Sequence, residues 1–241
     1  MERGAGILMH IASLPGEFGI GTLGKEAYKF ADFLNKSGIK NWQILPIGHT
    51  SYGDSPYQCF SAFAGNPYFI DFDMLRDQGI LKEEDYKYEN YGKNPEKIDY
   101  ALIFDVKYKV LKKAYKNFIE ATYLDDLKKK FEVFKDENKF WLEDYSLYMA
   151  VKNSLGLISW HEWDEDIKLR KPEAMKKYKE ELADEIIYFN SLGKEVQFKI
   201  VDKMLNNLKE RLKSQYFLVD FSENVMRLIQ PTFHELRAVP S

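Results

Sequence analysis

Cysteine is nearly absent from this sequence of 241 residues, which contains Cys59 alone. One thiol excludes an internal disulfide and any metal site that is built from several cysteines. A lone cysteine more often behaves as a small core residue than as a nucleophile, and we expect this of Cys59. No group of histidines and acids has the spacing of a zinc or EF-hand site, so no metal is expected.

Long apolar runs and an excess of one charge are missing as well. No run approaches the ~18 apolar residues that a membrane helix requires, and the N-terminus lacks the pattern of a signal peptide. The 35 basic and 38 acidic residues leave a net charge of −3, without a basic patch that would indicate nucleic acid. We therefore expect a cytoplasmic protein with neither membrane nor nucleic acid as partner. Its length allows one large core or two small ones.

The most informative stretch that is present runs over residues 41–73. The apolar run 42–47 predicts a buried strand that ends at a turn. Residues 52–58 are rich in turn formers and predict an ordered loop. Residues 66–71 are expected to be extended, because Pro67 disfavours the α conformation in the residue before it.

The side chains of this loop are unusual for a turn. Two tyrosines lie among a carboxylate, a hydroxyl and an amide, at Tyr52, Asp54, Ser55, Tyr57 and Gln58. A sugar has an apolar face that can lie on an aromatic ring, and its rim of hydroxyls needs a few well-placed polar groups. The loop is therefore a candidate sugar site. Alternatively, the rings fix the loop to the core, and Asp54 and Ser55 make turn hydrogen bonds alone.

Four segments of the sequence carry a resemblance to a known family. They are Gly-Ile-Leu-Met-His at 6–10, Trp-Gln-Ile-Leu-Pro at 42–46, Gly-Asp-Ser-Pro-Tyr-Gln at 53–58 and Phe-Ser-Ala-Phe-Ala-Gly-Asn-Pro-Tyr at 60–68. In these segments the chain resembles the amylomaltases, the 4-α-glucanotransferases of glycoside hydrolase family 77. The family commonly has a proline where His49 stands and a glycine where Ser51 stands.

The resemblance implies an α/β fold, the start of a (β/α)₈ TIM barrel with a large helical insertion, incomplete in this chain. The residue pattern predicts a first buried strand over 6–14 and a helix over 22–37 that ends at Gly38. With the strand at 42–47 these form a βαβ unit, whose strands are expected to be parallel neighbours. Barrel sites lie on loops after the C-termini of strands, which is the position of residues 48–66.

From about Asp99 the apolar residues step by three and four, which predicts a succession of helices. These residues are Phe104, Tyr108, Leu111, Tyr115, Phe118, Leu127, Phe131, Phe134, Trp141, Tyr145, Tyr148, Met175, Tyr178, Leu182, Ile186 and Phe189. Pro172 suits the first position of a helix. Trp160 and Trp163, between the helical segments, are expected to be packing anchors.

Three parts of the chain follow from this pattern. We expect the first barrel strands and the substrate loop in 1–98, a helical insertion in 99–190, and a divergent helical tail in 191–241. The resemblance is expected to end near Phe189, which indicates a fragment or a changed reading frame.

The resemblance also implies site residues. In the family the loop tyrosines help to hold the glucan, and Tyr57 is expected near the reacting sugar. His10, within the first predicted strand, is either a hydrogen-bonded core residue or a further group that faces the substrate. The predicted substrate-binding residues are Tyr52, Asp54, Ser55, Tyr57 and His10.

The reaction that the resemblance implies is transfer of an α-1,4-glucan segment to the 4-hydroxyl of an acceptor sugar. It needs no cofactor, and its partners are maltooligosaccharides or α-1,4-glucan. A retaining covalent mechanism requires two carboxylates roughly 5–5.5 Å apart. The family nucleophile lies in an Arg-x-Asp-His segment that does not occur here, so we expect no catalytic residue in this chain. The alternative is a non-catalytic fragment that binds α-glucan weakly or only folds.

Overall fold

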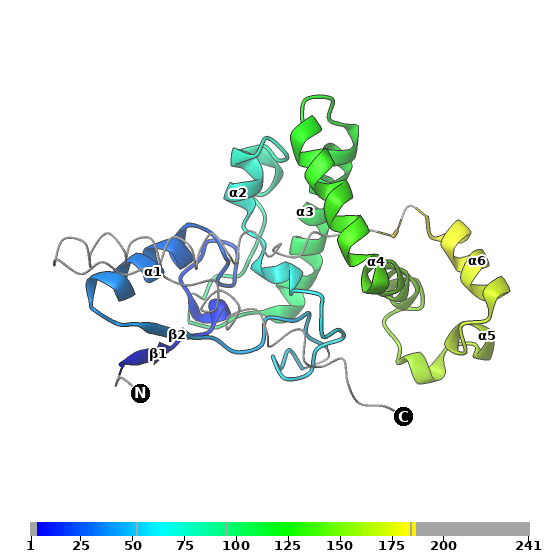
Figure 1. Ribbon diagram of the computed structural model, residues 1–241, viewed down its shortest axis with the longest axis horizontal. Helices are drawn as coiled ribbons and strands as arrows, with labels where there is room; N and C mark the ends of the chain where they lie inside the picture. The colour runs from blue at the N-terminus through cyan, green and yellow to red at the C-terminus, as the bar shows by residue number, and fades with distance from the viewer. Residues whose placement is uncertain (1–3, 52, 95, 184, 187–241) are drawn as a thin grey trace.

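The computed structural model describes residues 4–51, 53–94, 96–183 and 185–186. Helices dominate the described residues (Figure 1). The helices and strands, in chain order, are β1 (Gly6–Leu8), α1 (Lys25–Lys36), β2 (Asn41–Gln43), α2 (Phe72–Asp77), α3 (Tyr100–Glu120), α4 (Asp125–Ser154), α5 (Glu165–Lys168) and α6 (Pro172–Glu181), with short 3₁₀ helices at Ile11–Ser13, Pro67–Phe69, Glu83–Asp85 and Trp160–Glu162.

β1, α1 and β2 form the expected βαβ unit. The two strands are parallel and pair directly, with Ile7 opposite Trp42. α1 buries Ala27, Ala31 and Leu34 on one face, as its apolar spacing predicts. The helix ends before Gly38, whose φ of +73° is a conformation that glycine adopts without steric cost.

Both strands are shorter and more exposed than expected, so the prediction of buried strands over 6–14 and 42–47 is wrong. Leu8 is 58% exposed and Ile44 is 40% exposed. Each strand has one neighbour within the described residues, which leaves edges and part of the sheet surface uncovered. After β1 the chain turns into the 3₁₀ helix at Ile11–Ser13, so His10 lies in a connection and not inside a strand.

Residues 66–71 are not extended throughout, which corrects a further expectation. Asn66 lies outside the α region, as predicted from the proline after it, but Pro67–Phe69 is a 3₁₀ helix. The side-chain oxygen of Asn66 accepts a hydrogen bond from the Tyr68 amide at 3.0 Å. This cap, together with the fixed φ of Pro67, favours a tight turn over a strand.

α3 confirms the helix predicted around residues 104–118. Asp99 caps its N-terminus, because the Asp99 carboxylate accepts a hydrogen bond from the Leu102 amide at 3.1 Å. One face of α3 packs into the main core, against side chains from α2, from residues 80–91 and from Phe18. The buried aromatic and aliphatic members of this core include Phe18, Phe72, Leu81, Tyr86, Tyr91, Val110, Leu111 and Phe118.

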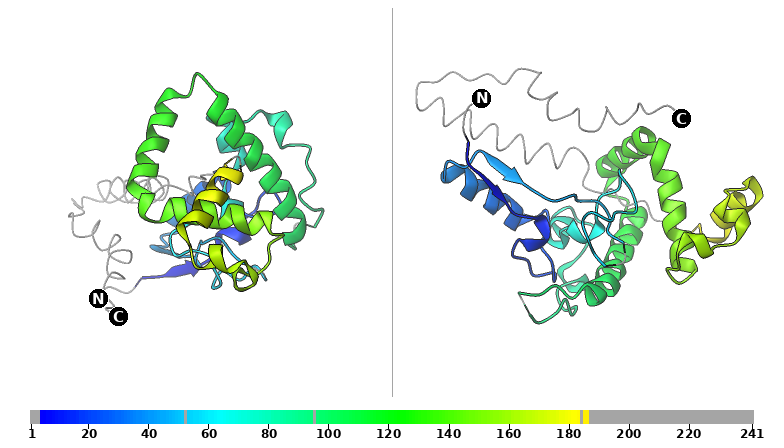
Figure 2. Two further views of the ribbon diagram at one scale, coloured as in Figure 1. Left: turned by 90° about the vertical axis from the view of Figure 1, so that its right-hand side faces the viewer. Right: turned by 90° about the horizontal axis from the view of Figure 1, so that it is seen from below.

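α4 joins the two segments predicted around 127–134 and 141–148 into one helix of 30 residues. Its C-terminal part packs through Leu147 and Val151 on α5 and α6, which lie together at one end of the molecule (Figures 1 and 2). Trp163 is buried in this packing, as expected of an anchor, whereas Trp160 is 45% exposed. α6 has Pro172 at its first position, as predicted, but it ends at Glu181.

Some expectations are not reached by these observations. The predicted tail, residues 191–241, lies outside the described residues, and the division at residues 98 and 99 stays a prediction. Among the described residues, no helix combines the length and the apolar character that a membrane span requires.

Candidate functional site

The loop at residues 48–66, which we call the site loop, follows β2 and folds back on itself. Isolated antiparallel bridges join Gly48 to Gly65 and Thr50 to Cys59. The His49 amide also donates to the Ala64 carbonyl at 3.2 Å. Backbone pairing therefore holds the base of the site loop, and the turn at residues 53–58 forms its tip.

The tip contains an uncommon backbone conformation. Gly53 and Asp54 both have positive φ, at 90° and 53°, and aspartate tolerates this region better than most side chains. The Asp54 amide donates to the Ser51 carbonyl at 3.0 Å, which closes the turn. Burial raises the pKa of Asp54, and its carboxylate accepts no hydrogen bond from the described residues. Tyr52, also predicted to bind substrate, lies outside the described residues.

Ser55 and Tyr57 lie in the same turn, but Ser55 makes hydrogen bonds within the turn and the Tyr57 side chain is exposed to solvent. The Ser55 carbonyl accepts from the Gln58 amide at 3.0 Å, and its hydroxyl accepts from the Tyr57 amide at 3.4 Å. Ser55 thus supports the turn, as the alternative interpretation expects. The Tyr57 side chain is 72% exposed, so its ring presents an aromatic face to solvent.

His10 is not joined to this tip by a hydrogen bond or ring contact in the described part of the chain. Its ring meets Phe69 edge-on, with centroids 5.4 Å apart. Burial lowers the pKa of His10, which keeps the ring neutral at pH 7. Its Nδ1 atom is buried and finds no hydrogen-bond partner within the described residues, so the expected core hydrogen bond is not seen there.

Two further tyrosines lie near Asp54 and were missed as site residues from sequence. Burial raises the pKa of both Tyr68 and Tyr100, and the nearby charge of Asp54 raises them further. Their ring centroids are 6.5 Å apart. Tyr68 ends the Asn-Pro-Tyr segment, which was visible in sequence, whereas Tyr100 comes from α3 and gives no local signal of proximity.

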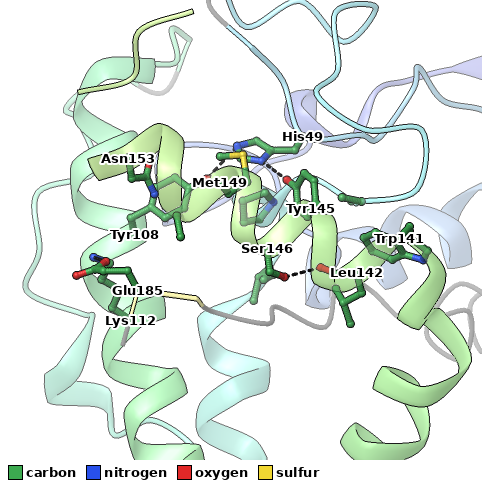
Figure 3. Close-up of a pocket in the computed structure, with 15 residues that line it drawn as sticks. His49, Tyr108, Lys112, Trp141, Leu142, Tyr145, Ser146, Met149, Asn153 and Glu185 are labelled. Atoms are coloured by element: carbon green, nitrogen blue, oxygen red, sulfur yellow. Dashed lines mark hydrogen bonds and ion pairs between the residues drawn. The ribbon is translucent and has the colours of Figure 1, made fainter. Parts of the chain in front are cut away.

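The base of the site loop contains a second group that sequence reasoning missed. His49 is 5% exposed and lies between α3 and α4. Its Nε2 is 2.9 Å from the Tyr108 hydroxyl, and its Nδ1 is 2.5 Å from the Tyr145 hydroxyl (Figure 3). A pocket of about 50 Å³ adjoins these side chains, with Trp141 and Met149 also in its wall.

The chemistry available at the tip is that of binding. It offers an exposed aromatic ring at Tyr57 and a carboxylate at Asp54 that is free to accept hydrogen bonds. Cys59 directly follows the tip in the chain. Its thiol donates to the Pro56 carbonyl at 3.2 Å, and burial raises the pKa of this thiol. Among the described residues, no group of three or more histidines, cysteines and acids could hold a metal.

Comparison with known proteins places these features in context. A family model described as 4-alpha-glucanotransferase matches residues 9–218. This match continues well past Phe189, so the expectation that the resemblance ends there is wrong. The residues beyond it show helical spacing but none of the short motifs that carried the resemblance, and such spacing is common to many families.

Individual proteins agree with the family model. The 4-alpha-glucanotransferase of Clostridium butyricum is 56% identical over 184 residues, which cover 76% of this chain and 37% of that protein. That of Thermus thermophilus is 40% identical over 188 residues, covering 78% and 36%. The structure "Amylomaltase from Streptococcus agalactiae in complex with acarbose" matches with a TM-score of 0.75 and 40% identity, over 87% of this chain and 41% of that one. The chain thus spans less than half the length of these relatives.

Proposed function

The chain belongs to the 4-alpha-glucanotransferase family, glycoside hydrolase family 77, and we propose that its site loop holds α-1,4-glucan for the transfer reaction of that family. In that reaction a glucan segment passes to the 4-hydroxyl of an acceptor sugar. The substrates are maltooligosaccharides or longer α-1,4-glucan. The loop contributes binding, and the reaction at the glycosidic bond requires other groups.

The observation that carries this proposal is the composition of the tip. The Tyr57 ring is 72% exposed, and the Asp54 carboxylate of the same turn accepts no hydrogen bond from the described residues. A pyranose can lie on the ring while one of its hydroxyls donates to the carboxylate. Tyr52 and Ser55 complete the predicted set, and His10 is retained in it as a neutral acceptor.

The carboxylates of a retaining mechanism do not lie in this set. Such a mechanism needs a nucleophile and an acid/base held roughly 5–5.5 Å apart. The 241 residues contain no Arg-x-Asp-His segment, which carries the nucleophile in the resemblance. We therefore assign binding to these residues and no catalytic role, with no cofactor required.

The likeness to amylomaltase extends this assignment to the fold. We propose that β1 and β2 are the first strands of a (β/α)₈ barrel, which is incomplete in this chain. α3 to α6 form the helical insertion. The parallel pairing of β1 with β2 across α1 supports this proposal, as does the position of the site loop after the C-terminus of β2.

Calorimetric titration of the purified chain with acarbose and with maltotriose tests the proposed function. Acarbose suits the test because the matching amylomaltase structure is a complex with it. We expect saturable binding of both compounds and none of cellotriose, which has β-1,4 links. Absence of binding to either α-linked compound would favour the alternative, a chain that only folds.

A parallel assay measures glucose release from maltotriose. We expect a rate at background, because loss of a covalent nucleophile removes orders of magnitude in rate. Glucose release that persists through repeated purification would show that acids within this chain perform the chemistry.

A further inference from the structure

His49 connects three parts of the chain that are distant in sequence. The residue belongs to the site loop, while Tyr108 belongs to α3 and Tyr145 to α4, 59 and 96 positions away. Both ring nitrogens lie within hydrogen-bond distance of a tyrosine hydroxyl (Figure 3). The Phe60 ring meets the imidazole edge-on at 5.2 Å between centroids. The imidazole of His49 therefore makes a polar contact from the site loop to α3 and another to α4.

The two hydrogen bonds match a neutral imidazole. In that form one ring nitrogen carries a proton and donates, while the other accepts. A tyrosine hydroxyl can do either, so one tyrosine donates to His49 and the other accepts from it. Burial raises the pKa of Tyr108 and of Tyr145, which keeps both hydroxyls protonated.

Few surrounding groups could stabilise a positive charge on His49. From α4, Tyr148 contacts Phe60, and the Lys152 ammonium lies 5.4 Å from the centroid of the same ring. From the loop itself comes the Cys59 thiol, whose pKa burial raises. At the pocket wall the Glu185 carboxylate is paired with the Lys112 ammonium at 2.7 Å. Each of these groups is neutral, cationic or already paired.

We propose that His49 is a positioning residue whose neutral imidazole fastens the base of the site loop to α3 and α4, so that protonation of this ring releases the loop. The consequence for glucan rests on the proposed function, because release of the base would displace the tip that holds the sugar. The fastening itself is a property of the fold and holds without any sugar.

The lowered pKa of His49 agrees with this proposal, both in its direction and in the pH range over which the loop should respond. Burial lowers the pKa of His49 to about 4, against an ordinary value near 6.5. The open loop therefore binds a proton more readily than the closed loop between these two values. Closure is strongest above pH 6.5, and its equilibrium constant falls about tenfold for each pH unit between 6.5 and 4.

Hydrogen–deuterium exchange of site-loop peptides at pH 7 and pH 4.5 tests this proposal on the whole chain. The matched variant is His49→Gln, whose amide can donate to one tyrosine and accept from the other but does not titrate. Comparison of the two proteins at each pH removes the intrinsic pH dependence of exchange. We expect protection of residues 48–66 to fall at least tenfold at pH 4.5 in the wild type and to persist in the variant.

His161→Gln is the control, since His161 is exposed and should leave the wild-type response unchanged. NMR of the histidine side chains gives a second measure. The resonance that is present in the wild type and absent from His49→Gln belongs to His49, and we expect it to titrate well below pH 6.5. Equal loop exchange in wild type and His49→Gln at both pH values would overturn the proposal, and so would an ordinary titration of His49 near pH 6.5.

Acarbose binding at the same two pH values separates this proposal from the proposed function. We expect binding to weaken at pH 4.5 in the wild type and to be retained in His49→Gln. If neither protein binds acarbose at pH 7, the proposed function fails, while the exchange result still decides whether His49 fastens the loop.

Discussion

At the scale of single residues, exposure separates the side chains that can bind a ligand from those that hold the loop in place. Tyr57 is 72% exposed, whereas Tyr68 is 4% exposed and packs with the core. A substitution at Tyr57 should therefore act on binding and leave the free energy of unfolding almost unchanged.

Tyr57→Ala tests this role of an exposed ring. We expect glucan binding to weaken by roughly 1 kcal/mol, which corresponds to about fivefold in Kd. Tyr88→Ala is the matched control, because Tyr88 is 85% exposed and lies outside the site loop. The measurements are calorimetric titration with maltotriose and the midpoint of thermal unfolding. A fall in that midpoint for Tyr57→Ala alone would instead indicate that the ring fixes the loop.

Lys107 is expected to influence the free energy of unfolding and the way in which this free energy depends on pH. It is fully buried, and its ammonium donates to the carbonyls of Tyr68 and Ile70 at 2.8 and 3.3 Å. Its Nζ also lies 4.7 Å from the centroid of the Phe72 ring. Burial lowers the pKa of Lys107 to about 7, with the charge of Asp71 opposing that shift.

The sign of this effect follows from proton binding. Between pH 7 and the ordinary lysine value near 10.4, the unfolded chain holds the proton and the folded chain does not. The free energy of unfolding should therefore rise with pH over 7–10, by up to about 1.4 kcal/mol per unit. Lys107→Met should lose this rise, which urea unfolding at pH 7 and pH 9.5 would measure. A parallel pH response in both proteins would contradict it.

At the scale of elements, two glycines cannot easily be replaced, for different reasons: Gly38 follows the end of α1, and Gly21 packs against the 3₁₀ helix at Ile11–Ser13. Gly38 has φ +73°, and a Cβ there would meet no described atom within 4 Å. A Cβ on Gly21 would lie 1.9 Å from the Ile11 carbonyl oxygen. At Gly38 the backbone conformation disfavours a residue with a side chain, whereas at Gly21 close packing leaves no space for one.

These differences predict unequal costs for the same substitution. Gly38→Ala should lower the free energy of unfolding by about 1 kcal/mol, the cost of a left-handed conformation for a residue with a Cβ. Gly21→Ala should cost several times more, because the 3₁₀ helix at Ile11–Ser13 must move. Urea unfolding of both variants measures the two values. Equal losses would mean that the 3₁₀ helix adjusts easily.

Helices were more predictable from sequence than strands or the site. The apolar spacing that predicts α3 is a local feature of the sequence, and the Asp99 cap that the structure adds is local as well. The ends of β1 depend on strand partners and covering layers, so the apolar run 6–14 overstated its length. The tip of the site loop could be predicted because its own residues carry the signal. The contacts of His49 join it to residues that are 59 and 96 positions away in the chain, and no local sequence pattern indicates them.

At the scale of the whole molecule, α4 links separate clusters of buried residues. Near its middle, Trp141 and Leu142 pack with Ala64 of the site loop. Further along, Leu147 and Val151 pack with α5 and α6. The main core instead involves α2 and α3, with Phe131 from the N-terminal half of α4, and it lies away from α5 and α6 in the right-hand view of Figure 2. We therefore expect α5 and α6 to open independently of the main core.

Trp163→Ala tests whether these parts of the molecule open separately. Trp163 is 8% exposed and packs with Leu147 and Ile167, so its truncation should cost roughly 3–5 kcal/mol within that cluster. Native-state hydrogen exchange should then accelerate in α5 and α6 while α3 keeps its protection.

Trp160→Ala is the matched control for this experiment, because Trp160 is 45% exposed on the same short connection. It removes an equal volume of side chain with little loss of packing, so exchange in α5 and α6 should stay close to that of the wild type. If Trp163→Ala accelerated α3 as strongly as α6, one cooperative unit would include both. α4 would then transmit the loss of packing from one cluster to the other, and the site loop, which packs on α4 through Ala64, should lose protection in the same experiment.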